Sequence, residues 1–174
     1  MINAIAFEYA PIKTKSAVLG HLLFLTMAVV LPMITHLFGF NFLVAQPMHW
    51  IVLFAGITYG PISGLLIGLA VPLMSTLLTG MPVPFMLPLM IPELMAYGFI
   101  AGSLKERVSA FASITMALII GKLCFIGMMI LLGRLDISIT QFAINTWSMS
   151  GVTMIMQILA LPILAGFYIK WINE

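Results

Sequence analysis

Long apolar runs separated by short corners set the pattern of this chain. The stretch 46–102 shows it most clearly, with a single charge, Glu93, and two tight corners, at Gly60-Pro61 and at 80–84. A helix needs about 20 apolar residues to cross the hydrocarbon core of a bilayer. Inside lipid a helix also satisfies its own backbone hydrogen bonds. The pattern therefore predicts three membrane-crossing helices in this stretch alone.

The same pattern extends over the rest of the chain. Residues 1–15 read as a short amphipathic lead-in, and residues 134–146 as a loop or an interfacial helix. In the second apolar run only the part after Pro47 has a helical pattern, and that part is short. We predict an all-α fold, an integral membrane bundle of six transmembrane helices that forms a single transmembrane domain over residues 1–174. The predicted spans are 16–38, 42–59, 62–79, 85–104, 108–133 and 149–168.

Basic residues orient this bundle. Six spans place both termini on one side, and most of the loop and terminal basic residues fall there, with only Arg134 on the other side. By the positive-inside rule both termini are predicted to be cytoplasmic. The triplet 105–107 is the most charged point of the chain, so we expect a solvated loop there. The basic residues on the side of the termini are Lys13, Lys15, Lys105, Arg107 and Lys170.

Composition and missing motifs narrow the function. Charged residues make up 7% of the chain, against roughly 25% in soluble domains. A net charge of +2 is too small to indicate nucleic-acid binding, so the expected surroundings are membrane lipid. The sequence has no phosphate-binding loop, no His-Glu-x-x-His helix and no nucleophile elbow. These absences favour a binding and transport element over an ATPase or another enzyme.

Two glycines predict a close helix contact. Gly64 and Gly68 lie four positions apart, so on a helix they form one smooth stripe. Small residues at this spacing let a second helix backbone approach closely in a membrane. Pro72 continues the stripe.

Glu93 and Lys122 are the two ionisable residues at depth in the predicted spans, histidines aside. Each costs about 2.5–3.5 kcal/mol at the bilayer centre, so each needs a partner or water. Their depths in two consecutive antiparallel helices predict that the side chains reach one another. The pair then either holds the two spans together or contacts a ligand.

The histidines differ by position. His36 and His49 flank the short turn 39–41 at the predicted outer end, where Asn41 and Gln46 lie between them. The two imidazoles can converge on one outward-facing cavity, or each can be an interfacial side chain bonded to backbone. His21, near the opposite end of the first span, is interpreted as structural.

Methionines gather near the predicted outer end. Any one of them can simply pack against lipid or core, but several at one depth suggest an adaptable pocket wall. The loop 80–85 is a candidate lid for that pocket. The methionines concerned are Met33, Met48, Met81, Met86 and Met90.

An ordered series of short segments carries a family resemblance. With the chain length and the six predicted spans, they make the chain resemble a substrate-binding S component of an energy-coupling-factor (ECF) transporter. The segments are Gln46-Pro47-Met48-His49, Ala55-Gly56, Gly60-Pro61-Ile62-Ser63-Gly64, Gly68, Pro72-Leu73, Leu77-Leu78-Thr79-Gly80-Met81-Pro82, Pro92-Glu93-Leu94-Met95-Ala96-Tyr97-Gly98 and Ala101-Gly102.

The resemblance implies a multi-pass protein of the prokaryotic inner membrane that captures a vitamin or cofactor from outside and topples to release it inward. It implies a transmembrane scaffold subunit and two ATPase subunits as partners. The family docks on the scaffold through small residues four apart in the first span, a spacing held here by Ser16 and Gly20, although the family usually has alanines. Substrate binding in the outer half makes these the candidate ligand contacts: His36, Asn41, Gln46, His49, Met81, Met86, Met90, Glu93 and Arg134.

The substrate stays open between two classes. A methionine-lined site with few hydrogen-bonding groups suits a flat ligand such as haem, with His49 or His36 as iron ligand and Arg134 on a propionate. A pyridoxine-type vitamin is an equal alternative. The protein is expected to need no cofactor of its own, so haem enters only as a transported ligand. The rival interpretation is a stand-alone small-molecule carrier or channel.

Overall fold

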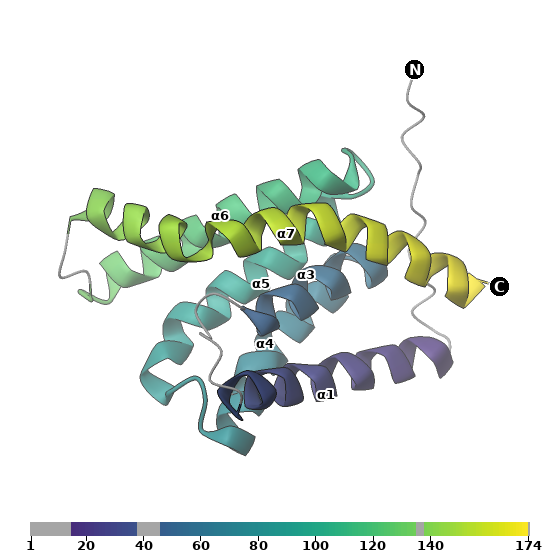
Figure 1. The fold of residues 1–174 in the computed structure, drawn as a ribbon, viewed down its shortest axis with the longest axis horizontal. Coiled ribbons are helices and arrows are strands. Elements are labelled where there is room, and N and C mark those ends of the chain that lie inside the picture. Colours follow the sequence, from purple (N-terminus) through teal and green to yellow (C-terminus); the bar gives the residue numbers. More distant parts are fainter. Residues whose placement is uncertain (1–14, 38–45, 135–137, 174) are drawn as a thin grey trace.

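The computed structural model describes residues 15–37, 46–134 and 138–173, and its regular elements are all helical, as the sequence predicts (Figure 1). The amphipathic lead-in predicted before residue 15 lies outside the described residues. The elements are α1 (Lys15–Leu37), α3 (Pro47–Tyr59), α4 (Pro61–Thr79), the short 3-10 helix η1 (Pro84–Met86), α5 (Leu87–Leu104), α6 (Ala110–Leu131) and α7 (Ile139–Asn173).

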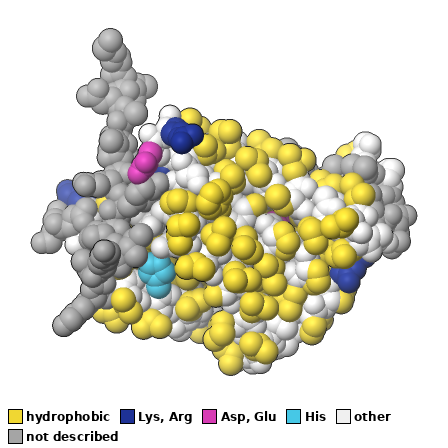
Figure 2. All heavy atoms as spheres, turned by 180° about the vertical axis from the view of Figure 1, so that it is seen from behind, with side chains coloured by type: hydrophobic (Ala, Val, Ile, Leu, Met, Phe, Trp, Pro, Cys, Tyr) yellow, Lys and Arg dark blue, Asp and Glu magenta, His cyan; other side chains and the backbone are white. Residues whose placement is uncertain are grey.

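Five helices of the described chain are long and apolar enough to cross a membrane. The surface in Figure 2 agrees, because apolar side chains cover the middle of that face and charged ones lie toward its ends. The protein is thus a multi-pass membrane bundle. The six-span count and the cytoplasmic termini stay predictions. The five segments are Ala17–Ile34, Pro61–Thr79, Pro84–Leu104, Ala110–Leu131 and Ser150–Ile172.

Helix α3 is the short central element. Its 13 residues extend only about 20 Å at 1.5 Å per residue, and the residues 42–45 predicted to begin this span lie outside the described part of the chain. Almost every residue of α3 is buried, because α1, α4, α5 and α7 all pack on it. Pro47 occupies its first turn, where the missing N–H costs nothing. Gly60, at φ 97°, turns the chain sharply into α4.

Helix α7 begins earlier than the sequence pattern predicts. The segment 134–146 was expected to be a loop or interfacial helix apart from the last span, but from Ile139 it is continuous with that span in one 35-residue helix. The Ser138 hydroxyl accepts a hydrogen bond from the Gln141 backbone N–H at 3.2 Å, as a helix N-cap does. Low hydropathy indicates only that these residues need not lie in the hydrocarbon core, and it does not prevent them from forming a helix.

The glycine stripe predicted on α4 is confirmed as a backbone contact with α5. A Cβ placed on Gly64 would overlap the carbonyl group of Gly98, and a Cβ on Gly68 would lie 2.6 Å from the Leu94 carbonyl oxygen. Gly56 of α3 approaches the same Gly98 carbonyl. Helix α5 is therefore held against two helices at once through one glycine.

The charged corner between α5 and α6 differs from the solvated loop expected. Glu106 and Arg107 are exposed, but Lys105 is only 6% exposed. Burial lowers the pKa of Lys105 to about 8, while the neighbouring Glu106 carboxylate opposes this shift. The lysine stem is long enough to pack against the helix ends, so a charged residue in a short corner can be buried there.

Substituting Gly64 should weaken the bundle. The new methyl group of Gly64→Ala has to push α4 and α5 apart, and we expect the free energy of unfolding to fall by about 1–3 kcal/mol. Thermal unfolding of the purified protein in detergent measures it. Gly127→Ala in α6 is the matched control, because its Cβ meets no atom within 4 Å. Equal melting of Gly64→Ala and wild type would show that the glycine contact is not required.

Candidate functional site

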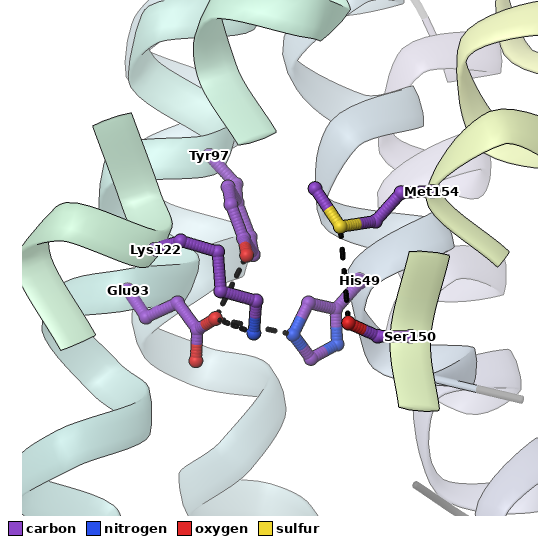
Figure 3. A network of polar contacts seen from close by, with 6 residues as sticks. All are labelled: His49, Glu93, Tyr97, Lys122, Ser150 and Met154. Atoms are coloured by element: carbon purple, nitrogen blue, oxygen red, sulfur yellow. Dashed lines mark hydrogen bonds and ion pairs between the residues drawn. The ribbon is translucent and has the colours of Figure 1, made fainter. Parts of the chain in front are cut away.

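A buried carboxylate lies at the centre of the polar network shown in Figure 3. Glu93 of α5 is 2% exposed. Its Oε1 accepts a hydrogen bond from Tyr97 Oη at 2.7 Å and lies 2.5 Å from Lys122 Nζ. His49 Nε2 lies 3.6 Å from the same oxygen. One oxygen atom therefore contacts three side chains from three helices.

The local sequence explains why these groups meet. Glu93 and Tyr97 lie four positions apart, so they share one face of α5. The Tyr97 ring packs directly against Gly121 of α6. Only glycine fits there, because a Cβ at this position would overlap the ring. The next residue, Lys122, then reaches Glu93. The predicted contact between Glu93 and Lys122 is confirmed.

His49 enters the network from the first turn of α3. Its ring centroid lies 5.2 Å from that of Tyr97, and the residue is 7% exposed, so the imidazole faces the bundle interior. Neither ring nitrogen has a hydrogen-bond partner among the described residues. Figure 3 shows Ser150 and Met154 of α7 on the side of the ring away from Glu93. His49 thus lies between the ion pair and α7.

Two buried glutamines also have unpartnered amide atoms. Gln46, just before α3, is 8% exposed, and its Oε1 finds no donor among the described residues. Gln157 of α7 is fully buried, with neither Oε1 nor Nε2 bonded to any described group. Gln157 is not among the site residues predicted from the sequence, although a carboxamide inside the apolar run 150–172 is a signal for it.

The loop proposed as a lid is attached to the end of α4. The Ser75 hydroxyl donates to the Met81 carbonyl oxygen at 2.7 Å, and the Thr76 hydroxyl donates to that of Pro82 at 2.7 Å. Arg134 donates to the Phe85 carbonyl oxygen and lies 5.6 Å from the centroid of its ring. Arg134 therefore connects the end of α6 to this loop, and its predicted ligand contact stays a prediction.

The methionines predicted to line a pocket have different surroundings. Met90, one turn before Glu93, is buried at 9% exposure, and Met86 is partly buried against the core. Met81 is partly exposed in the loop. Only Met90 of these three lies within the bundle core, so their shared role as a pocket wall stays a prediction.

Two of the predicted ligand contacts fall outside the described parts of the chain. Asn41 belongs to the segment 38–45, and nothing is described of the His36 side chain. Their convergence with His49 stays a prediction. Among the described residues, no group of three histidine, cysteine or acidic side chains could hold a metal ion. His49 is the predicted iron ligand that the structure describes.

His21 is structural, as interpreted from the sequence. One ring nitrogen lies 2.7 Å from the Ala17 carbonyl oxygen, and the other lies 3.0 Å from the Ser63 hydroxyl of α4. The imidazole therefore connects α1 to α4 near the end of the bundle where α3 finishes.

The predicted docking residues of α1 are only partly described. Gly20 is buried, and a Cβ there would overlap the Tyr59 hydroxyl and lie 2.7 Å from that of Tyr168. Its small size thus serves a contact within this chain. The side chain of Ser16 lies outside the described part, and the docking role stays a prediction.

Removing either member of the buried ion pair should lower the free energy of unfolding. We expect Glu93→Gln and Lys122→Met each to lower the free energy of unfolding by roughly 3–5 kcal/mol, because each leaves one charge without its partner. Thermal unfolding of both single variants and the double variant measures the coupling. The double variant should lose clearly less than the two single losses combined.

Lys170→Met provides the matched control for Lys122→Met, because Lys170 is exposed near the end of α7. Its effect should stay within about 0.5 kcal/mol. Strictly additive losses in the double variant would contradict a stabilising pair between α5 and α6.

Comparison with known proteins assigns the family. Residues 14–172 match the family model for the ECF transporter, substrate-specific component. Neither a curated protein nor a solved structure matches the chain. The family is a substrate-binding component of transporters and not a family of enzymes, and it works with transmembrane and ATPase modules and a small-molecule substrate. Since the match covers nearly the whole chain, the protein belongs to the substrate-specific components of ECF transporters.

Proposed function

We propose that the protein captures a small heteroaromatic vitamin of the pyridoxine type at the outer side of a prokaryotic inner membrane. The scaffold and ATPase subunits then use ATP to complete its uptake. The observation that carries this proposal is His49, whose two ring nitrogens are buried without a hydrogen-bond partner beside the pair of Glu93 and Lys122. A neutral imidazole has one donor and one acceptor, and a polar ligand can use both.

The charges of the network support a ligand without large net charge. Glu93 and Lys122 offset one another, so the centre as a whole is close to neutral when His49 is neutral. A ligand with several uncompensated charges would have to break this pair, at the cost of an unpaired charge in the membrane interior. Hydroxyl groups and a ring nitrogen can instead bond to His49 while the pair stays intact.

Haem is the second candidate. It is favoured by the unpartnered imidazole of His49. Met48, next to His49 in the chain, and Met90, one turn before Glu93, are also buried, at 1% and 9% exposure. The enclosure of His49 argues for the smaller ligand, because a tetrapyrrole needs far more of the packed interior to open. Unpartnered carboxamide groups also suit a ligand rich in hydrogen-bonding groups.

The affinity for pyridoxine should therefore depend on His49. Pyridoxine should bind the purified protein, and His49→Ala should weaken its affinity about 10-fold or more, because the ligand loses its bonds to the imidazole. Isothermal titration calorimetry in detergent measures this. His21→Ala is the matched control: it removes an imidazole that is bonded within the chain, so affinity should persist even if stability falls.

Haem added to the same samples tests the alternative. We expect no shift of the Soret band. A shifted band in wild type that disappears in His49→Ala would replace the vitamin by a tetrapyrrole as the ligand. Equal pyridoxine affinity of wild type and His49→Ala would remove His49 from the site.

Transport should depend on partners. In proteoliposomes, sustained pyridoxine uptake should require the scaffold and ATPase subunits together with ATP, because this chain has no nucleotide-binding motif of its own. Radiolabelled uptake with and without ATP measures it. ATP-independent accumulation by this chain alone would establish the stand-alone carrier instead.

A further inference from the structure

Gln157 is a polar side chain whose place in the packing needs an explanation. It is 0% exposed within the membrane-crossing segment Ser150–Ile172, and both atoms of its carboxamide lack a hydrogen-bond partner among the described residues. A carboxamide that leaves water without gaining a partner loses free energy, so such groups are rare in folded proteins. An apolar side chain of similar volume would fill the same space without that loss.

The register between α3 and α7 places Gln157 in the same half of the bundle as the network around His49. The two helices run in the same direction (Figure 1), and the hydroxyls of Tyr59 and Tyr168 lie 2.7 Å apart near their ends. Gln157 precedes Tyr168 by eleven positions, and Met48 precedes Tyr59 by eleven. Since each residue advances a helix by about 1.5 Å, equal counts back from the tyrosine pair bring Gln157 to the same half of the bundle as Met48 and its neighbour His49.

The close-up view shows which part of α7 lies beside the imidazole. Figure 3 shows Ser150 and Met154 beside His49, two turns and one turn before Gln157. Inward-facing positions of α7 thus reach the imidazole, and Gln157 follows on the same face of the helix, three residues later. Among the described residues, the side chains with unpartnered buried atoms therefore lie at the start of α3 and on the face of α7 that includes Met154. They are Gln46, His49 and Gln157.

We infer that the Gln157 carboxamide is a specificity-determining contact of the transported ligand, and that this ligand offers both a hydrogen-bond donor and an acceptor to α7. The inference rests on the proposed function, and it adds α7 to a site otherwise built from α3 and α5. A carboxamide donates from Nε2 and accepts at Oε1. It matches hydroxyl-bearing heterocycles and discriminates against apolar analogues, because an apolar group would leave it unbonded.

The first test needs no ligand. Gln157→Leu removes the unpartnered carboxamide, so the ligand-free protein should melt about 2–4 °C higher than wild type. Gln141→Leu is the matched control in the same helix, at an exposed position, and should leave the melting temperature nearly unchanged. A lower melting temperature for Gln157→Leu would mean that Gln157 has a structural partner, and it would overturn the inference whichever ligand is transported.

The second test uses pyridoxine as probe. Its affinity for Gln157→Leu should fall about 10-fold or more relative to wild type, while Gln141→Leu should bind as wild type does. Loss of affinity with a gain of stability separates a ligand contact from a packing residue. Undiminished binding to Gln157→Leu would overturn this inference and leave the proposed function standing.

A failure of the proposed function and a failure of the role inferred for Gln157 give different results. If wild type does not bind pyridoxine, the proposed ligand class is wrong, and the role of Gln157 for that class is wrong with it. If wild type binds pyridoxine and His49→Ala does not, but Gln157→Leu does, then only the role of Gln157 is wrong.

Discussion

The backbone contact at Gly98 fixes the position of α5, and with it the rest of the bundle. Lipid gives two apolar helices little reason to associate, so close packing between small residues has to supply the attraction. Gly56 of α3 and Gly64 of α4 both approach the carbonyl group of Gly98. Because α5 is held on two sides within one turn, Glu93 and Tyr97 on that helix have little freedom to move. The polar network therefore forms on a scaffold set by glycines.

The network itself follows from a second constraint, the cost of charge in a membrane. Glu93 cannot reach water from its position at 2% exposure, so its charge has to be offset within the bundle. Lys122 supplies the opposite charge and Tyr97 a further hydrogen bond to the same oxygen. These contacts stabilise the ion pair but leave His49, 3.6 Å away, without a hydrogen bond of its own. The described part of the bundle thus contains a bonded ion pair and, beside it, an imidazole without a hydrogen bond.

The sequence could predict what depends on spacing and depth. Helix type, the Gly64 and Gly68 stripe and the Glu93–Lys122 contact all follow from positions along consecutive helices. The early start of α7 could not be predicted, since polar residues at a helix end look the same in sequence as a loop. Gln157 could not be predicted as a site residue, because its role depends on which face of α7 is buried. The burial of Gly20 against two tyrosines was equally invisible, since it joins α1 to residues distant in the chain.

The contrast between the two sides of α3 indicates where a bound ligand would add most to the attraction between helices. On the side of α4 and α5, Gly56 is packed against backbone, and a ligand could enter only by separating helices already in contact. Toward α7, the chain makes a tyrosine–tyrosine hydrogen bond at one end, while Gln157 and His49 find no hydrogen-bond partner among the described residues. A ligand bonded to both side chains would add attraction between α3 and α7 where the protein has not supplied it. It would do so without disturbing the glycine contact that holds α5.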